Sequence, residues 1–353
     1  MKISDQDLNH IFEHTRPLWE YLRGKKIFVT GGTGFFGKWL LESFAWVNDQ
    51  LKLDAQMLVL SRSPRRFSTR YPHLAHVSCI RFYQGDVMDF EFPRERFDFI
   101  IHAATDVGTQ SNAENSILII KTIVEGTRRT LEFACQCGVK RFLFISSGAV
   151  YGKQPPGLSH LPEDYSEAPD PLQPVSAYGE AKLLAELLCA VYQKQCGLEM
   201  TIARCFAFVG PYLNLNVHYA VGNFIRDGLA GGHVHISGDG TPCRSYLYTA
   251  DLAIWLWTIL FRGAPGEIYN VGSDNAVSIK DLAYEVAALF SNSSQVVIAQ
   301  SSVPGLPPER YVPSVKKARE DLGLDSWINL KEALHRTVKW NQIINKSEDE
   351  RLI

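Results

Sequence analysis

The feature that most constrains the fold of this chain is a glycine-rich loop between an apolar strand and a helix. Ile27-Phe28-Val29 is a short apolar run that predicts a buried strand, and residues 38–47 are typical of a helix. Between them lies Thr30-Gly31-Gly32-Thr33-Gly34-Phe35-Phe36-Gly37. Gly31 permits a tight turn, Gly34 allows phosphate oxygens to approach the backbone, and Gly37 allows close packing of helix and strand. Such a loop suits the pyrophosphate of a dinucleotide, because backbone N–H groups and the positive helix end meet there; the alternative is a plain turn.

Further apolar runs alternate with helical segments along the first two thirds of the chain. Strands are predicted at 57–60, 80–82, 99–101, 142–145 and 200–204, with long helices at 117–135 and 177–195. This alternation predicts an α/β fold, a Rossmann-type doubly wound parallel sheet with helices on both faces. Beyond residue 210, glycine-rich turns, a short strand at 233–236 and a helix at 279–290 predict a smaller C-terminal α+β substrate domain.

These patterns give three expected units. Residues 1–23 form a polar, helical N-terminal extension, and residues 24–205, with about 240–275, form the dinucleotide-binding domain. Residues 206–239 and 276–345 form the substrate domain.

Composition and charge exclude several classes of protein. The 353 residues are 46% hydrophobic and 21% charged, which is typical of a folded globular chain. With 36 basic and 38 acidic residues the net charge is −2, so we expect no nucleic-acid partner and no membrane surface partner. The apolar stretch 252–261 is too short to span a bilayer, and the N-terminus lacks a signal sequence, which predicts a cytoplasmic protein. The seven cysteines are odd in number and lack zinc-like spacing, so neither disulfides nor a metal site is expected.

The glycine spacing, G-x-x-G-x-x-G after a threonine, resembles the extended short-chain dehydrogenase/reductase group, the NAD(P)-dependent nucleotide-sugar epimerase/dehydratase family. Two further motifs carry the resemblance, which spans about residues 25–340: Gly85-Asp86-Val87, and Ile101-His102-Ala103-Ala104. It implies that Asp86 accepts a hydrogen bond from the adenine amine. One residue departs from the family pattern, because Ile123 stands where a motif before the fifth strand often has asparagine. The cofactor-binding residues implied are Gly31, Thr33, Gly34, Phe35, Phe36, Gly37, Arg62, Asp86, Val87, Ala103, Ala104, Tyr178 and Lys182.

The end of the second strand bears on the choice of cofactor. A NAD site needs a carboxylate there to hold the ribose hydroxyls, whereas a 2′-phosphate needs a cation. The strand ends Leu60-Ser61-Arg62-Ser63 without a carboxylate. Arg62 therefore favours NADP, and NAD remains the alternative cofactor. If Arg62 has no role in cofactor binding, it belongs to an exposed basic loop.

A tyrosine and a lysine are spaced for acid–base work. Tyr178 and Lys182 stand at i and i+4, on one face of a helix, where a cation lowers the pKa of a phenol. Ser147 follows the fifth strand and would project at the carboxyl edge of the sheet. The resemblance implies that Ser147 binds the reacting sugar oxygen, Tyr178 exchanges its proton, and Lys182 holds the cofactor ribose and tunes Tyr178. The alternative is a capping serine with a surface Tyr–Lys pair.

The resemblance also implies that the second domain binds the nucleotide sugar, and it implies which residues contact this substrate. Arg244 lies in a G-x-G-x-x-x-R stretch whose arginine clamps the substrate diphosphate, and Arg310 is a second anion contact. Asn223 and Phe224 lie where relatives hold the nucleotide base. The alternatives are ordinary surface arginines and a core aromatic.

The residues after Ser147 bear on the type of reaction. Dehydratases of the family place Asp-Glu there, and the related decarboxylases keep the glutamate, whereas this chain has Gly148 and Ala149. Neither can move a proton, so we expect hydride transfer at the hexose C4, as in a 4-epimerase or a 4-ketoreductase of a polysaccharide or deoxysugar pathway. A 4,6-dehydratase or decarboxylase with non-standard acid and base residues and a non-catalytic NADP-binding regulator remain as alternatives. The helices at 117–135 and 177–195 would form the four-helix interface of a homodimer, which is common among relatives.

Overall fold

A seven-stranded parallel sheet forms the centre of the molecule. The computed structural model describes residues 2–105, 115–217, 219–290 and 295–349. All neighbouring strands of the sheet run parallel, which confirms the predicted doubly wound sheet; β11 was not among the predicted strands. In spatial order the strands are β3 (Ile80–Gln84), β2 (Gln56–Ser61), β1 (Lys26–Thr30), β4 (Phe99–His102), β5 (Arg141–Ser147), β6 (Glu199–Cys205) and β11 (Ile268–Val271).

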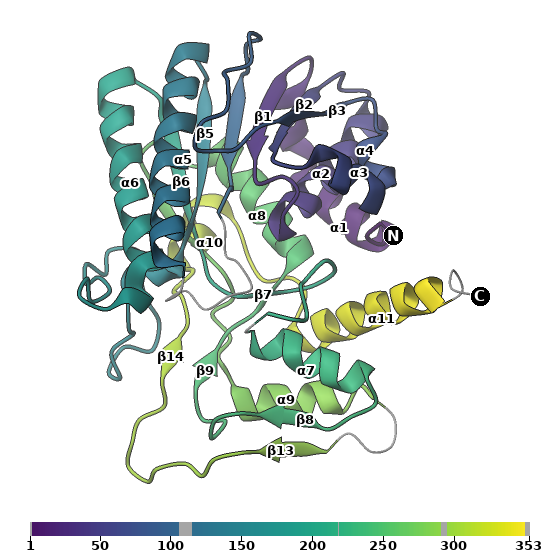
Figure 1. Cartoon of the computed structure of the whole chain (residues 1–353), viewed down its shortest axis with the longest axis vertical. Helices are drawn as coiled ribbons and strands as arrows, with labels where there is room; N and C mark the ends of the chain where they lie inside the picture. The colour runs from purple at the N-terminus through teal and green to yellow at the C-terminus, as the bar shows by residue number, and fades with distance from the viewer. Residues whose placement is uncertain (1, 106–114, 218, 291–294, 350–353) are drawn as a thin grey trace.

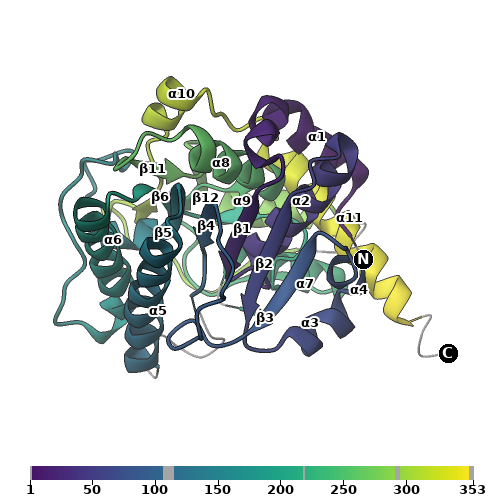
Figure 2. The ribbon, with the colours of Figure 1, turned by 90° about the horizontal axis from the view of Figure 1, so that it is seen from above.

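Helices cover both faces of this sheet (Figure 2). One face is covered by α5 (Ser116–Cys137) and α6 (Ala177–Cys196), and the other by α2 (Phe35–Leu51) and α8 (Thr249–Arg262). Side chains alternate between the two faces along each strand. In β1, Ile27 and Val29 join the hydrophobic core on the α2 and α8 side, while Phe28 joins the core on the α5 and α6 side. The apolar strand runs in the sequence therefore reflect burial on both faces.

The apolar stretch near residue 255 is a core helix. Every residue of α8 from Thr249 to Phe261 is buried, including the rings of Trp255 and Trp257. Such a helix is apolar all round because the sheet and other helices surround it. Within the described ranges, no helix is both long enough and apolar enough to cross a membrane.

The N-terminal segment is helical, as predicted, and it packs onto the same core. It consists of α1 (Asp5–Thr15) and the 3-10 helix η1 (Arg16–Leu22). Leu8, Ile11 and Trp19 are fully buried or nearly so, and the rings of Trp19 and Trp257 lie 4.8 Å apart. These contacts with α8 make the segment part of the main hydrophobic core.

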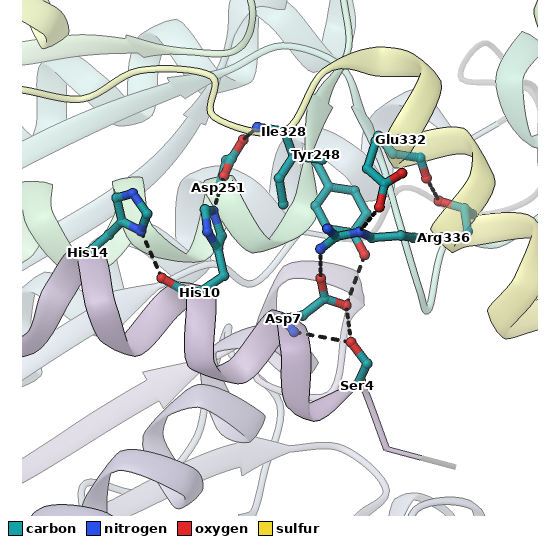
Figure 3. A network of polar contacts seen from close by, with 11 residues as sticks. Ser4, Asp7, His10, His14, Tyr248, Asp251, Ile328, Glu332 and Arg336 are labelled. Carbon is teal, nitrogen blue, oxygen red and sulfur yellow. Dashed lines mark hydrogen bonds and ion pairs between the residues drawn. The ribbon is translucent and has the colours of Figure 1, made fainter.

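Polar contacts join the same segment to distant parts of the chain (Figure 3). The carboxylate of Asp7 accepts hydrogen bonds from Arg336 at 2.7 Å and from the Tyr248 hydroxyl at 3.0 Å. His10 contacts Asp251 in α8 at 2.8 Å, and the other oxygen of Asp251 accepts from the backbone N–H of Ile328 at 3.0 Å. Arg336 belongs to α11 (Leu330–Asp349) and Tyr248 to β10 (Leu247–Tyr248). The network therefore connects the two ends of the chain with the start of α8.

A smaller lobe lies at one end of the sheet (Figure 1). Its helices α7 (Ala220–Leu229) and α9 (Ile279–Ala287) pack beside the parallel strand pair β8 (Val234–Ile236) and β13 (Val296–Ile298). A second small sheet holds β9 (Cys243–Arg244) between β12 (Val277–Ser278) and β14 (Arg310–Tyr311). The short remaining elements are α3 (Pro64–Arg70), α4 (Pro72–Ala75), η2 (Gly148–Tyr151), η3 (Pro174–Ser176), β7 (Phe208–Val209), which pairs with β10, and α10 (Lys316–Leu322).

Candidate active site

The glycine-rich loop closes a tight turn between β1 and α2. Gly31 has a φ of 72°, and a Cβ atom placed on it would lie 2.5 Å from the carbonyl carbon of Ala103, which follows β4. The Gly34 N–H donates to the Gly31 carbonyl at 3.0 Å, and Gly34 is the N-cap of α2 without a side chain to cap the helix. A Cβ on Gly37 would meet the backbone of Gly32. The 17-residue helix α2 therefore begins beside a turn in which Gly31 and Gly37 leave no room for a side chain, which fits a phosphate cradle.

The other predicted cofactor residues follow neighbouring strands. Arg62 follows β2 and is exposed, Asp86 follows β3, and Ala103 and Ala104 follow β4. Parallel strands bring these ends to one edge of the sheet, beside the glycine loop. The Asp86 carboxylate accepts from the backbone N–H of Met88 at 3.0 Å. In the glycine loop, Thr33, Phe35 and Phe36 are partly exposed, whereas Val87 is buried against Gly126 of α5.

His102, in the motif that ends β4, is a structural residue. Its ring is fully buried and contacts the hydroxyl of Thr30 at 2.7 Å and that of Thr127 at 3.0 Å. Burial, with a smaller effect from the charge of Lys182, lowers the pKa of His102 to about 3, so the imidazole is neutral at pH 7. These bonds join β4 to β1 and α5. Ile123, which replaces the asparagine of the family pattern, is buried in the core under α5.

Ser147 and Tyr178 meet at the carboxyl end of β5. Ser147 ends the strand, and its hydroxyl accepts from the Ala149 N–H at 3.2 Å at the start of η2. Tyr178 lies in the first turn of α6, and its phenol is buried beside the Ser147 hydroxyl. Burial raises the pKa of Tyr178, while the nearby Ser147 hydroxyl acts in the opposite direction. The next residue, Gly179, allows this approach, because a Cβ there would lie 2.5 Å from the Ala149 carbonyl oxygen.

Lys182 lies one helical turn after Tyr178 and points toward the sheet. Its ammonium group donates to the Ile145 carbonyl at 2.8 Å and lies 4.8 Å from the centre of the Phe144 ring. Burial lowers the pKa of Lys182 to about 8.

A buried ion pair that sequence reasoning missed supports this helix. Glu186, one turn beyond Lys182, accepts from Arg204 of β6 at 2.7 Å and from the hydroxyl of Ser146 at 2.5 Å. Both charged side chains are buried. The pair ties α6 to β5 and β6, and so holds Tyr178 and Lys182 over the end of the sheet.

Tyr311 is a second phenol at the site, and it too was missed. It follows Arg310 in β14, and in the register of the small sheet it is the partner of Arg244 in β9. Its ring packs against Phe206, with centres 4.7 Å apart, and its hydroxyl oxygen lies 2.6 Å from the position that a Cβ on Gly148 would take. The signal in the sequence was its position beside Arg310, but no local pattern predicts that β14 reaches the end of β5.

The predicted substrate residues lie in the smaller lobe. Arg244 is partly buried and donates to the carbonyl of Cys243, and Arg310 donates to the Ser159 carbonyl at 3.3 Å. Asn223 is partly exposed on α7, whereas Phe224 is only 2% exposed and belongs to the core. The ring of Phe224 is therefore covered by protein, which is the core-aromatic alternative of the sequence analysis.

Comparisons with known proteins agree with this architecture. The model of the NAD dependent epimerase/dehydratase family matches residues 27–272. UDP-glucuronic acid decarboxylase 1 of Arabidopsis thaliana is 30% identical over 333 residues, which are 93% of this chain and 72% of that protein. dTDP-D-glucose 4,6-dehydratase of Mus musculus is 26% identical over 329 residues, or 90% of this chain and 88% of that protein.

A solved structure has the same fold. UDP-glucuronic acid 4-epimerase of Bacillus cereus, in complex with UDP-glucuronic acid and NAD, aligns with a TM-score of 0.77 and 24% identity. The alignment covers 90% of this chain and 99% of that one. The three similar proteins carry names of three different reactions, each on a nucleotide sugar.

Proposed function

The chain belongs to the NAD dependent epimerase/dehydratase family, and we propose that it transfers a hydride at C4 of the sugar of a nucleotide sugar. It does so as a 4-epimerase, through a transient 4-ketone, or as a 4-ketoreductase. The observation that carries this proposal is that the buried phenol of Tyr178 lies beside the Ser147 hydroxyl at the end of β5, with Lys182 one helical turn away. These groups stand at the edge of the sheet where the glycine loop and α2 begin.

Each of the three residues has a role that follows from its surroundings. The hydroxyl of Ser147 binds the sugar oxygen at C4, because it already stands beside the phenol that exchanges the proton. Tyr178 takes the proton from that oxygen when the sugar is oxidised and returns it when the ketone is reduced. Lys182, protonated at pH 7 because its pKa of about 8 lies above that value, binds the cofactor ribose near Tyr178.

The glycine loop fits the pyrophosphate of a dinucleotide, because Gly31 leaves no room for a side chain and Gly34, the N-cap of α2, places none before the first N–H groups of the helix. When bound, the nicotinamide would supply or accept the hydride. Arg62, exposed at the end of β2, would pair with a 2′-phosphate, so we propose NADP in preference to NAD. Asp86, Ala103 and Ala104 would contact the rest of the cofactor.

The smaller lobe would hold the nucleotide part of the substrate. Arg244 and Arg310 would bind the diphosphate, since both strands that carry them meet beside Tyr311 and Ser147. Asn223 would contact the base, and Phe224 would support it from the core.

The residues after Ser147 favour simple hydride transfer over elimination. Gly148 and Ala149 have no ionisable group, so the acid and base that the family's dehydratases place there are missing. Dehydration and decarboxylation, the activities named for two relatives, would need other residues in these roles.

A homodimer is proposed through α5 and α6. Both helices lie on the outside of the molecule in Figure 2, and their surfaces carry large apolar side chains. The exposed ones are Ile117, Leu118 and Ile120 on α5, and Leu184, Leu187 and Val191 on α6. A second copy of the chain would cover these side chains in a four-helix bundle.

The test is an assay of the purified protein with NADPH or NADP⁺ and a panel of nucleotide sugars and their 4-keto derivatives. Stoichiometric loss of NADPH absorbance identifies a ketoreductase, and a new sugar isomer without net loss identifies an epimerase. Release of CO₂ or formation of a 4-keto-6-deoxy sugar would identify the alternative reactions and refute the proposal. Cofactor binding without turnover of any substrate would support the regulator instead.

The matched variant is Tyr178→Phe, which keeps the ring and removes the hydroxyl. We expect it to lower kcat by about 100-fold or more, the usual contribution of a general acid–base group. Cofactor affinity should stay unchanged. Equal activity of the variant and the wild type would contradict the proposed mechanism.

A further inference from the structure

A buried asparagine of the central sheet connects two segments that flank the candidate active site. Asn270 lies in β11, and its side chain is fully buried. Its Oδ1 accepts a hydrogen bond from the hydroxyl of Tyr151 at 2.7 Å. Its Nδ2 donates to the carbonyl of Leu161 at 2.8 Å and to that of Ser314 at 3.1 Å. The acceptor of the amide therefore serves one segment, and its two donors serve another.

The first segment is the turn that follows β5, which we call the Ser147 turn (residues 147–151). Ser147 is the N-cap of η2, and Tyr151 is its last residue. The side chain of Tyr151 is 1% exposed, and the guanidinium of Arg204 lies 4.6 Å from the centre of its ring. Because η2 is one turn of four residues, the bond from Tyr151 to Asn270 restrains the backbone that leaves Ser147.

The second segment, which we call the β14 arm, consists of residues 310–314 with Leu161. The N–H of Leu161 donates to the Val312 carbonyl at 2.9 Å, and its carbonyl accepts from the Ser314 N–H at 2.8 Å. Leu161 and Val312 are fully buried. Arg310, the expected diphosphate contact, begins this arm. The two donors of the Asn270 amide therefore hold both chains of the arm.

We propose that Asn270 is a positioning residue that fixes the β14 arm and the Ser147 turn relative to each other. The inference rests on the function proposed above, in which Ser147 binds the sugar oxygen and Arg310 binds the diphosphate. One nucleotide sugar bound at both places spans the distance between them, so hydride transfer needs that distance to be constant. The central sheet supplies the reference, because all four residues of β11 are paired with β6.

The type of side chain at position 270 matters because the three bonds need both an acceptor and two donors. Among side chains of this length, only the amide of asparagine offers them. A carboxyl group donates at most one hydrogen bond when protonated and none when ionised. The backbone of Asn270 is held as well, since its N–H donates to the Glu163 carboxylate at 2.9 Å. The two connections can therefore be removed separately by substitution.

The experiment measures kcat and KM of two variants with the substrate found in the panel. Tyr151→Phe keeps the ring beside Arg204 and removes only the hydroxyl, which loosens the Ser147 turn; kcat should fall about tenfold with KM unchanged. Asn270→Asp keeps an oxygen that accepts from Tyr151 but cannot donate to both carbonyls of the β14 arm. KM for the nucleotide sugar should therefore rise about tenfold with kcat nearly unchanged.

This crossed result distinguishes positioning from a loss of stability. Partial unfolding would lower the apparent kcat of both variants and leave KM unchanged, because the folded molecules would bind substrate normally. The proposal is wrong if Asn270→Asp has the KM of the wild type, or if Tyr151→Phe has its kcat.

Hydrogen exchange read by mass spectrometry tests the same contacts without substrate. Tyr151→Phe should speed exchange of the amides at 148–152 and leave those at 312–314 unchanged, and Asn270→Asp should do the reverse. If Asn270→Asp does not fold, Tyr151→Phe decides alone, because unchanged exchange at 148–152 would show that its bond to Asn270 does not restrain the turn.

The control is Tyr165→Phe. The rings of Tyr165 and Tyr151 lie 6.1 Å apart, but the Tyr165 hydroxyl donates to Glu167 at the surface, at 2.6 Å. Its kcat and KM should match the wild type, and a tenfold fall in kcat there would overturn the assignment to Asn270. If Tyr178→Phe is inactive but Tyr151→Phe and Asn270→Asp match the wild type, only the role of Asn270 is wrong. If Tyr178→Phe is fully active, the proposed function fails first.

Discussion

Replacement of Asp7 by asparagine tests whether the N-terminal helix is a clamp on the fold. The Asp7 carboxylate is 2% exposed and pairs with Arg336 of α11 at 2.7 Å. Asparagine keeps the shape but removes the charge, and the guanidinium of Arg336, 17% exposed, then loses one of its two anions. Breaking a buried pair costs about 3–5 kcal/mol, but Glu332 remains 2.6 Å from Arg336. We therefore expect a loss of about 2–3 kcal/mol in the free energy of unfolding.

The assay is urea unfolding followed by tryptophan fluorescence, which reports on Trp19 and Trp257 in the core beside α1. The control variant is Glu20→Gln, because the Glu20–Arg23 pair has a similar length, 2.8 Å, but is exposed to solvent. We expect no measurable change there. If both Asp7→Asn and Glu20→Gln unfold at the same urea concentration as the wild type, the contact of α1 with α11 does not stabilise the fold. The inference that the buried Asp7–Arg336 pair is worth more than the exposed Glu20–Arg23 pair would then be wrong.

Three further predictions concern the cofactor loop, a buried lysine and the outer face of α6. Gly31→Ala should weaken dinucleotide binding by at least about tenfold in a calorimetric titration. A positive φ at a residue with a side chain costs about 1–2 kcal/mol, and the new Cβ would also meet the backbone of Ala103. Equal affinity of the variant and the wild type would refute the role of this loop in binding the pyrophosphate. Burial lowers the pKa of Lys38 from 10.5 to about 8, so the folded state binds fewer protons than the unfolded chain between these values, and stability rises with pH across this window. Lys38→Met should remove that rise and be more stable at pH 7 by up to about 3 kcal/mol, which urea midpoints at pH 7 and pH 10 would check. Leu187→Glu should convert a dimer into a monomer in light scattering, and an unchanged mass would contradict the four-helix interface.

Much of the site could be predicted because its residues belong to local patterns. The glycine loop, Arg62 and Ala103 each follow an apolar strand, and parallel strands bring their carboxyl ends to one edge. Tyr178 and Lys182 share a helix face for the same local reason. The meeting of Ser147 and Tyr178 needed only the strand order as an additional assumption.

Other features depended on contacts between distant segments. The burial of α8 explains an apolar run that the sequence analysis could only call too short for a membrane. From the sequence alone, a buried Phe224 could not be distinguished from a Phe224 that stacks on the nucleotide base, because either role needs an aromatic ring on a helix.

The sequence by itself determined the alternation of strands and helices, the glycine-rich turn before α2 and the shared helix of Tyr178 and Lys182, because periodicity and short motifs encode them within a few residues. Only the tertiary structure decided that Asp7 pairs with Arg336, that Glu186 pairs with Arg204, and that Tyr311 reaches Ser147. The first and third contacts join elements that are far apart in the chain, and the second joins α6 and β6, which follow one another. Their meeting depends on how whole helices and strands pack, which no local pattern of residues specifies.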